Sequence, residues 1–165
     1  MRSLLLIAHN VRSAHNVGSL LRTADGLGVQ TVFLTGYTPY PVEANDKRLP
    51  HIAEKVERQI HKTALGAEKT VGWKHEEDIF GLIDKLKRDG FKIAALEQAD
   101  GSVKLPSFTP TDSIALIVGR EVEGIETDIV KQADIILEIP MLGQKESLNV
   151  ASAAAIALYH LRFKA

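Results

Sequence analysis

Two polar residues, Asn16 and Arg22, stand out in a largely apolar stretch near the start of this 165-residue chain. If that stretch is helical, residues such as Leu20 and Leu21 face the core, and Arg22 lies nearly two turns beyond Asn16. An arginine near an apolar face needs a carboxylate or phosphate partner, because an unpaired buried charge is costly. Arg22 is therefore a candidate anion-binding residue, or else half of a structural ion pair. Asn16 is of a type that caps helix N-termini.

A second group follows the apolar run 114–118 and reads Gly119-Arg120-Glu121-Val122-Glu123-Gly124-Ile125. A glycine at the end of a strand allows a ligand to approach the backbone closely. Glu121 could form a bidentate, charge-assisted pair with Arg22. The same residues would also suit an ordinary charged loop before a helix.

A third group begins with Ile139-Pro140-Met141-Leu142-Gly143 and continues through Glu146-Ser147-Leu148-Asn149 into a run of alanine and serine. Ser147 is suited to the N-cap of a closing helix. The small residues after it allow another segment or a ligand to come close. This run could therefore serve the core, a dimer interface or a cofactor site.

The hydrophobic pattern predicts the elements that must position these groups. Strands are expected at residues 3–8, 29–35, 70–73, 91–96, 113–118 and 135–139. Helices are expected from about residue 16 to 26, over part of 51–64, and at 76–88, 127–133 and 147–162. This alternation predicts a mostly parallel, three-layer α/β domain. Each of the three groups then lies at the end of a strand, where open α/β sheets bind their ligands.

Composition narrows the possible classes of protein. The chain is 45% apolar and 25% charged and contains no cysteine, which excludes disulfides and thiolate metal sites. No segment has the length of a signal-peptide core or a membrane span, and we expect a cytoplasmic protein. Residues 1–75 hold ten Lys and Arg against six Asp and Glu, whereas residues 76–165 hold ten against fifteen. The basic half could dock a phosphate backbone, although ordinary solvated charge explains the same count.

Two other kinds of site fit the sequence poorly. A dinucleotide-dependent oxidoreductase needs Gly-x-Gly-x-x-Gly at the opening of the first helix, but Gly26-Leu27-Gly28 ends that helix and Thr31 stands in the last position. A metal site would have to draw on the histidines, whose spacings match no helical pair of ligands. No metal is therefore expected at His9, His15, His51 and His61.

Taken together, the three groups resemble the SpoU branch of the SPOUT methyltransferases over nearly the whole chain. The shared features are Asn16 followed by Arg22, then Gly119-x-Glu121-x-x-Gly124 after a strand, then Ile139-Pro140-Met141 and Ser147-Leu148-Asn149-Val150-Ala151. The resemblance implies an S-adenosylmethionine-dependent RNA methyltransferase that acts on a ribose 2′-hydroxyl. It also implies a homodimer whose active site draws on both protomers. A C-terminal trefoil knot around the cofactor is implied as well, and nothing in the periodicity predicts one.

The resemblance further implies two sets of site residues. The cofactor would be held by Leu96, Glu97, Gly119, Ile139, Met141, Ser147 and Leu148. The catalytic group would be Asn16, Arg22, Glu121, Ser147 and Asn149. In this scheme Arg22 fixes an RNA phosphate and polarises the hydroxyl, while Asn16 and Asn149 orient both. The family's proposed activation of the hydroxyl by arginine is less expected, because a guanidinium keeps its proton.

The RNA target stays open, with transfer RNA favoured over ribosomal RNA by analogy with small relatives. We expect residues 1–165 to form a single methyltransferase domain without a separate RNA-binding domain. The domain would then select RNA through its own basic residues, such as Lys47, Arg48, Arg58, Lys62 and Lys69. A non-catalytic, dimeric RNA-binding module of the same fold is the alternative, but such a module would not need Arg22, Glu121 and Asn149 together.

Overall fold

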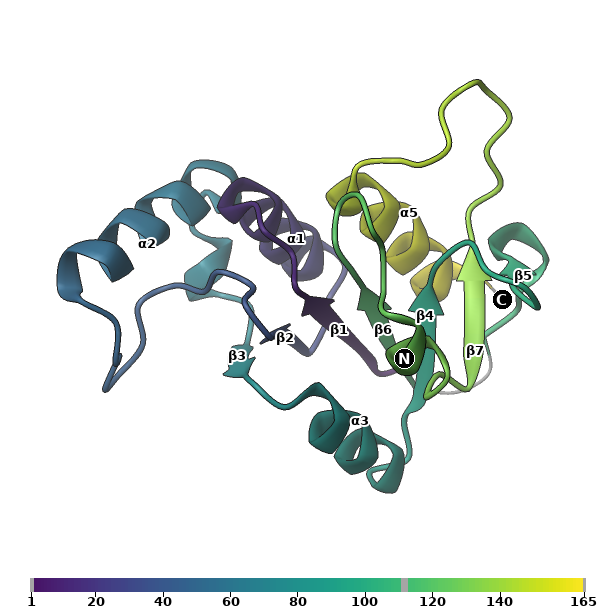
Figure 1. Cartoon of the computed structure of the whole chain (residues 1–165), viewed down its shortest axis with the longest axis horizontal. Helices are drawn as coiled ribbons and strands as arrows, with labels where there is room; N and C mark the ends of the chain where they lie inside the picture. Colours follow the sequence, from purple (N-terminus) through teal and green to yellow (C-terminus); the bar gives the residue numbers. More distant parts are fainter. Residues whose placement is uncertain (1, 111–112, 165) are drawn as a thin grey trace.

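A computed structural model describes residues 2–110 and 113–164 of the chain. In these ranges seven strands form one sheet, in the order β3-β2-β1-β6-β4-β7-β5, and every pairing is parallel (Figure 1). The strands are β1 (Leu4–His9), β2 (Thr31–Thr35), β3 (Trp73–Glu76), β4 (Lys92–Leu96), β5 (Val103–Lys104), β6 (Ile114–Val118) and β7 (Ile135–Glu138). The helices are α1 (Ala14–Gly26), α2 (Pro50–Ala64), α3 (Ile79–Arg88), α4 (Thr127–Val130) and α5 (Val150–Phe163).

Helices cover both faces of the sheet. One hydrophobic cluster joins alternate residues of β1, such as Leu4 and Leu6, to apolar residues of α1, α2 and α5. The second cluster joins the intervening residues, Leu5 and Ile7, to α3 and α4. A strand buried on both faces reads as an unbroken apolar run, which is why the central strands were visible in the sequence. The prediction of a three-layer, parallel α/β domain is confirmed.

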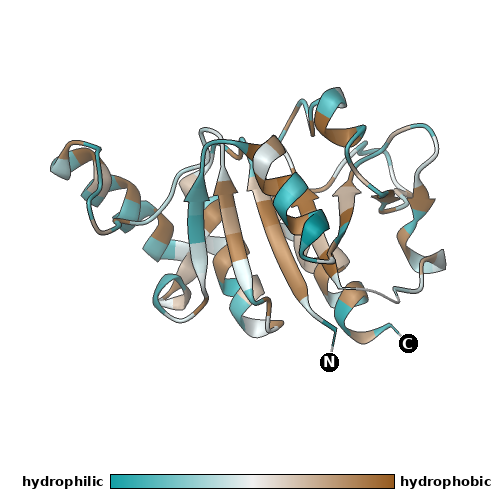
Figure 2. Cartoon of the chain, turned by 90° about the horizontal axis from the view of Figure 1, so that it is seen from below, coloured by the Kyte–Doolittle hydropathy of each residue, from teal (hydrophilic) through white to brown (hydrophobic). Residues whose placement is uncertain are grey.

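The edge strands are the least predictable part of the sheet. We expected a strand at 70–73, but β3 covers Trp73–Glu76, because the turn that starts at Ala67–Lys69 continues through hydrogen bonds from the amides of Thr70 and Val71 to the Ala67 carbonyl. The strand alternates half-buried and exposed residues, so it carries no apolar run. Figure 2 shows this hydrophilic strand at one edge and the apolar strands in the middle. The two-residue strand β5 at the other edge was not predicted at all.

Two predicted helix caps are wrong by a few residues. Helix α1 begins at Ala14, where Ser13 Oγ accepts a hydrogen bond from the amide of Asn16 at 3.2 Å. Helix α5 begins at Val150 and is capped by Asn149, not by Ser147. In both segments two good capping residues stand close together, and the sequence does not tell which one starts the helix. Both corrections leave the polar side chains of Asn16 and Ser147 free for other contacts.

Helices α1 and α2 pack closely through Gly18. A Cβ atom at Gly18 would overlap the carbonyl oxygen of Ile60 and the hydroxyl of Thr63. The Thr63 hydroxyl also donates a hydrogen bond to the carbonyl of His15 at 2.7 Å. The absence of a side chain at position 18 therefore lets α2 lie against the helix that carries Asn16 and Arg22. Within the described ranges, no helix combines the length and the apolar character needed to cross a bilayer.

Buried His9 and its neighbour Asn10 tie the end of β1 to two other loops. His9 Nδ1 lies 2.8 Å from Thr35 Oγ1, and His9 Nε2 lies 3.6 Å from Glu126 Oε2. Asn10 donates from Nδ2 to Glu126 Oε1 at 2.9 Å and accepts at Oδ1 from the amide of Tyr37 at 3.0 Å. The loops after β1, β2 and β6 are therefore held together at one edge of the sheet.

Replacement of Gly18 by alanine should destabilise the protein, because the new methyl group overlaps α2. Overpacking of this kind costs about 1–3 kcal/mol, which corresponds to roughly 3–10 °C in Tm for a chain of this size. Differential scanning calorimetry would measure the change. Gly26→Ala is the matched control, since no atom lies within 4 Å of a Cβ at Gly26. Equal Tm values for Gly18→Ala and the wild type would contradict the packing argument.

The stability of the protein should depend on His9 at mildly acidic pH. Burial lowers the pKa of His9 below its ordinary 6.5, with Arg120 acting in the same direction and Glu126 opposing. The unfolded chain then binds a proton more readily than the folded one, so the free energy of unfolding falls as pH drops below about 6.5. Unfolding midpoints in urea from pH 7 to 5.5 would show this fall. His9→Gln should flatten the profile, whereas His15→Gln, at an exposed position, should keep the slope of the wild type; equal slopes for all three would refute the assignment.

Candidate active site

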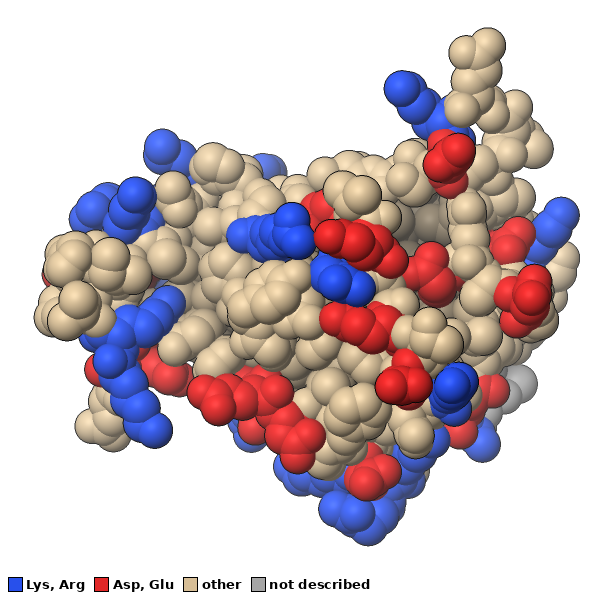
Figure 3. All heavy atoms as spheres, in the orientation of Figure 1, with Lys and Arg blue, Asp and Glu red and all other residues tan. Residues whose placement is uncertain are grey.

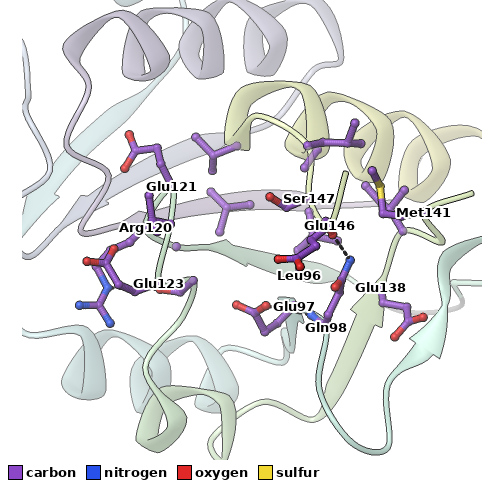
Figure 4. Close-up of a pocket in the computed structure, with 18 residues that line it drawn as sticks. Leu96, Glu97, Gln98, Arg120, Glu121, Glu123, Glu138, Met141, Glu146 and Ser147 are labelled. Carbon is purple, nitrogen blue, oxygen red and sulfur yellow. Dashed lines mark hydrogen bonds between the residues drawn. The ribbon is translucent and has the colours of Figure 1, made fainter. Parts of the chain in front are cut away.

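A cavity of about 290 Å³ opens at the carboxyl ends of β4, β6 and β7, next to the start of α5 (Figure 4). Parallel α/β sheets bind ligands in the crevice outside these strand ends. All seven residues predicted for the cofactor line this cavity: Leu96, Glu97, Gly119, Ile139, Met141, Ser147 and Leu148. The fold thus gathers into one place a set of residues that spans some fifty positions of sequence.

The carboxylate of Glu97 fixes one wall of the cavity. Its Oε2 atom accepts a hydrogen bond from the amide of Ile125 at 2.8 Å, and its Oε1 atom accepts one from the amide of Gln98 at 2.9 Å. Gly124 lies directly against this carboxylate, where a Cβ atom would overlap Oε2. Gly124 also has a φ of 72°, in the region that favours glycine. Position 124 therefore requires glycine for two reasons: a side chain there would overlap the Glu97 carboxylate, and the backbone has a positive φ.

The first glycine of the pattern closes a tight turn. A Cβ atom at Gly119 would come within 2.7 Å of Ile125 Cγ1 and 2.8 Å of the Gly124 carbonyl. Arg120 and Gly124 exchange two backbone hydrogen bonds of 3.2 Å across the turn. The wall of the cavity at Gly119 and Gly124 is therefore a tightly packed turn, which has no room for side chains at these two positions.

The cavity is strongly acidic. Five of the residues that line it are glutamates: Glu97, Glu121, Glu123, Glu138 and Glu146. Arg120 is the one basic residue in the lining among the described residues, and its Nε atom lies 3.7 Å from Glu126 Oε1. Acidic side chains also gather over the middle of the face seen in Figure 3. Such a lining favours a cationic ligand and opposes the pyrophosphate of a dinucleotide.

Three of these glutamates were missed in the sequence. Glu123 lies in the loop after β6, whereas Glu138 ends β7 and Glu146 lies in the connection from β7 to α5, and the fold brings all three to one cavity. Gln98, also missed, donates from Nε2 to the carbonyl of Glu146 at 2.8 Å and so joins the loop after β4 to the loop before α5. The sequence signal that could have revealed these glutamates is their position at or soon after the end of an apolar strand.

A chain of side-chain hydrogen bonds links the three sequence groups at the edge of the cavity. Asn149 Nδ2 donates to Asn16 Oδ1 at 3.1 Å, and Asn16 Nδ2 donates to Glu121 Oε1 at 3.2 Å. The backbone amides of Ser13 and Arg12 also donate to Glu121, at 3.1 and 3.3 Å. Burial raises the pKa of Glu121, but these hydrogen bonds outweigh it and the pKa lies below its ordinary value. Glu121 is therefore ionised at neutral pH and aligns the two asparagines.

Arg22 does not join this group within one chain. The expected pair between Arg22 and Glu121 is wrong, because nearer donors on Asn16, Ser13 and Arg12 already occupy the Glu121 oxygens. Arg22 lies on the exposed side of α1, and its side chain makes no hydrogen bond or ion pair to any described residue. Its guanidinium is thus open to a partner outside the chain.

Histidine side chains form no metal centre in the described part of the chain. There, no group of three or more His, Cys, Asp or Glu side chains is arranged to hold an ion. His9 contacts Thr35, and His61 Nδ1 lies 2.5 Å from Glu68 Oε1.

Comparison with known proteins gives the family. The model of the SpoU rRNA methylase family matches residues 3–159. The chain is 32% identical over 160 residues to the 23S rRNA (guanosine(2553)-2′-O)-methyltransferase RlmP of Bacillus subtilis, covering 96% of this chain and 57% of that protein. It is 31% identical over 161 residues to the tRNA (guanosine(18)-2′-O)-methyltransferase of Aquifex aeolicus, covering 96% and 68%.

A solved structure shares the fold. The AdoMet-bound rRNA methyltransferase from Sinorhizobium meliloti matches with a TM-score of 0.80 and 23% identity, over 97% of this chain and 56% of that one. The chain therefore spans little more than half the length of two of these three proteins. Because the family model matches nearly the whole sequence and two relatives exceed 30% identity, this chain belongs to the SpoU rRNA methylase family.

Proposed function

We propose that this protein transfers a methyl group from S-adenosylmethionine to a ribose 2′-hydroxyl of RNA. The observation that carries the proposal is the hydrogen-bonded chain from Asn149 through Asn16 to Glu121 beside an acidic cavity. The relatives named as 2′-O-methyltransferases of ribosomal and transfer RNA, and the AdoMet bound to the S. meliloti protein, support it. We favour transfer RNA as the target.

The cavity fits the proposed cofactor in charge and in shape. S-adenosylmethionine supplies a methyl group on a positively charged sulfonium, and five carboxylates line the cavity. Gly119 and Gly124 allow the loop after β6 to pack tightly against Ile125 and Glu97, where a Cβ atom would clash, and so fix this wall of the cavity. Apolar side chains suited to an adenine ring come from Leu96, Ile139, Met141 and Leu148. We assign cofactor binding to the seven residues predicted above.

The chain's own residues would act mainly by positioning. Methyl transfer needs an in-line approach, and fixing that geometry supplies much of the acceleration. Asn16 and Asn149, aligned by ionised Glu121, orient the ribose from the edge of the cavity, next to Ser147. Arg22 binds an RNA phosphate and donates a hydrogen bond to the ribose oxygen, which stabilises the negative charge that develops there as the hydroxyl proton passes to solvent water. Glu121 keeps its place as acceptor from Asn16 and two backbone amides, and does not take that proton.

A homodimer would complete this site. Helix α5 buries one apolar face, yet a second apolar row at spacings of three and four is exposed: Ile156, Tyr159 and Phe163. A helix that is apolar on two sides is normally covered on both. Pairing of α5 and the neighbouring α1 with a second copy would cover this row and bring Arg22 of one protomer towards the partner's cavity. We also infer the family's C-terminal knot, which would let residues 119–124 and 146–148 line one cavity from two sides.

RNA would bind this domain along helix α2, with one correction to the expected set of residues. Arg48 is not available, because its guanidinium donates to Asp46 Oδ1 and to the carbonyls of Tyr40 and Pro41 at 2.9–3.0 Å. An exposed row on α2 faces away from its buried residues at spacings of four, three and four: His51, Lys55, Arg58 and Lys62. Such a row can follow an RNA backbone.

The proposed function is tested with labelled S-adenosylmethionine and separated transfer and ribosomal RNA fractions, followed by mapping of the methylated nucleotide. We expect a 2′-O-methylated ribose in one fraction. Arg22→Ala should reduce transfer by about 100-fold or more, since it removes the phosphate anchor and the hydroxyl contact. Isothermal titration should show cofactor affinity close to that of the wild type. Cofactor binding without transfer by the wild type would favour a non-catalytic RNA-binding module, and full turnover by Arg22→Ala would exclude its role.

The α2 row should dominate the salt dependence of RNA binding. Each lost phosphate contact lowers the slope of log K against log salt by about 0.7–0.9, so the triple variant Lys55→Ala, Arg58→Ala, Lys62→Ala should lose roughly 2. Filter binding to the methylated fraction at several salt concentrations measures the slope. The control removes an equal charge from α3, on the opposite face: Lys85→Ala, Lys87→Ala, Arg88→Ala. Equal slopes for the two triple variants would show that α2 does not track the RNA.

A further inference from the structure

Tyr37 is an exposed aromatic residue at the same edge of the sheet as the cavity. It follows β2 directly, and 52% of its surface is exposed. Its backbone is nevertheless fixed, because its amide donates to Asn10 Oδ1 at 3.0 Å and Gly36 before it has a φ of 63°. A Cβ atom at Gly36 would overlap Asn10 Oδ1. The ring is thus presented to solvent from a rigid position.

The residue that holds Tyr37 is itself strained. Asn10 has a φ of 55°, which non-glycine residues rarely adopt. Both ends of its amide are used, since Nδ2 donates to Glu126 while Oδ1 accepts from Tyr37. Strained backbone persists where the surroundings enforce it and clusters at functional sites. Asn10 therefore holds the backbone of the exposed Tyr37 from a left-handed conformation.

A cation stands beside the ring. The Tyr37 hydroxyl and the Glu123 carboxylate raise the pKa of Arg12, so this guanidinium keeps its charge. Arg12 Nη2 lies 3.2 Å from Glu123 Oε1, and the Arg12 amide donates to Glu121 Oε2 at 3.3 Å. The Tyr37 hydroxyl and the Arg12 guanidinium therefore lie next to each other, and the Arg12 amide is bonded to the Asn16–Glu121 group.

We propose that Tyr37 and Arg12 form a platform for an unpaired nucleobase of the substrate RNA, at or next to the methylated nucleotide. The base stacks on the Tyr37 ring, and Arg12 contacts its edge or its phosphate. Proteins read single-stranded RNA by this combination of aromatic stacking and guanidinium contacts. The platform rests on the proposed function. The exposed apolar row proposed for the dimer lies on α5, whereas Tyr37 belongs to the loop after β2.

The test compares Tyr37→Ala and Tyr37→Phe with the wild type in direct binding to total transfer RNA and total ribosomal RNA. Tyr37→Ala should bind the preferred RNA roughly 5- to 100-fold more weakly, whereas Tyr37→Phe, which keeps the ring, should stay within about twofold. Arg12→Ala should weaken binding and lower its salt slope by about one contact. S-adenosylmethionine affinity by isothermal titration should not change in Tyr37→Ala or Tyr37→Phe. Phe80→Ala is the control, since Phe80 is 46% exposed on α3.

The possible outcomes separate the platform from the proposed function. Equal RNA affinity of Tyr37→Ala, Phe80→Ala and the wild type would overturn the platform, even if the wild type methylates RNA. A monomer–dimer shift of Tyr37→Ala in size-exclusion chromatography would also overturn it, by placing Tyr37 in a protein interface. A third outcome is that Tyr37→Ala weakens RNA binding but the wild type methylates neither RNA fraction. This outcome would refute the proposed function and would support the platform.

Discussion

The hydrogen bonds from Asn149 to Asn16 and from Asn16 to Glu121 join side chains that are 133 and 105 residues apart in sequence. They form only if β1 and β6 are neighbours and α5 begins next to α1. Asn149 strengthens this dependence, because its Oδ1 atom caps α5 while its Nδ2 atom donates to Asn16. The position of the closing helix, and with it one wall of the cavity, is thereby coupled to the residues proposed to orient the substrate.

The acidic lining of the cavity is held in place by hydrogen bonds to its carboxylates and by a glycine that makes room for one of them. Glu97 is stabilised by the amides of Ile125 and Gln98, and Gly124 leaves room for it. Glu121 is stabilised by Asn16 and two further amides. Burial raises the pKa of Glu121, but its hydrogen bonds outweigh this effect and keep that carboxylate charged beside the other glutamates. The remaining mutual repulsion is relieved by a bound cation, so the same lining that discourages phosphates favours a sulfonium.

The sequence predicted what depends on periodicity and missed what depends on strand order. Strands buried on both faces, such as β1 and β6, and the amphipathic helix α3 were visible. Edge strand β3 was misplaced because half of its residues face solvent. Asn16, Glu121 and Asn149 were grouped by resemblance, and the fold brings them together. The pair between Arg22 and Glu121 failed because nearer donors satisfy the carboxylate, a competition that spacing along the chain cannot reveal.

The charge of the cavity places a condition on how RNA can approach it. A phosphate beside five carboxylates is repelled unless cations accompany it, and Arg120, the basic residue in the lining, is already engaged with Glu126 and the Gly124 carbonyl. The exposed guanidinium of Arg12, near the end of β2, can supply one such cation for a phosphate. Arg22 is exposed on α1 and does not line the cavity of its own chain, so in the proposed dimer it would serve the cavity of the partner. An acidic pocket that favours a cationic donor is thus consistent with the proposal that Arg22 of a second copy helps to hold the anionic RNA strand.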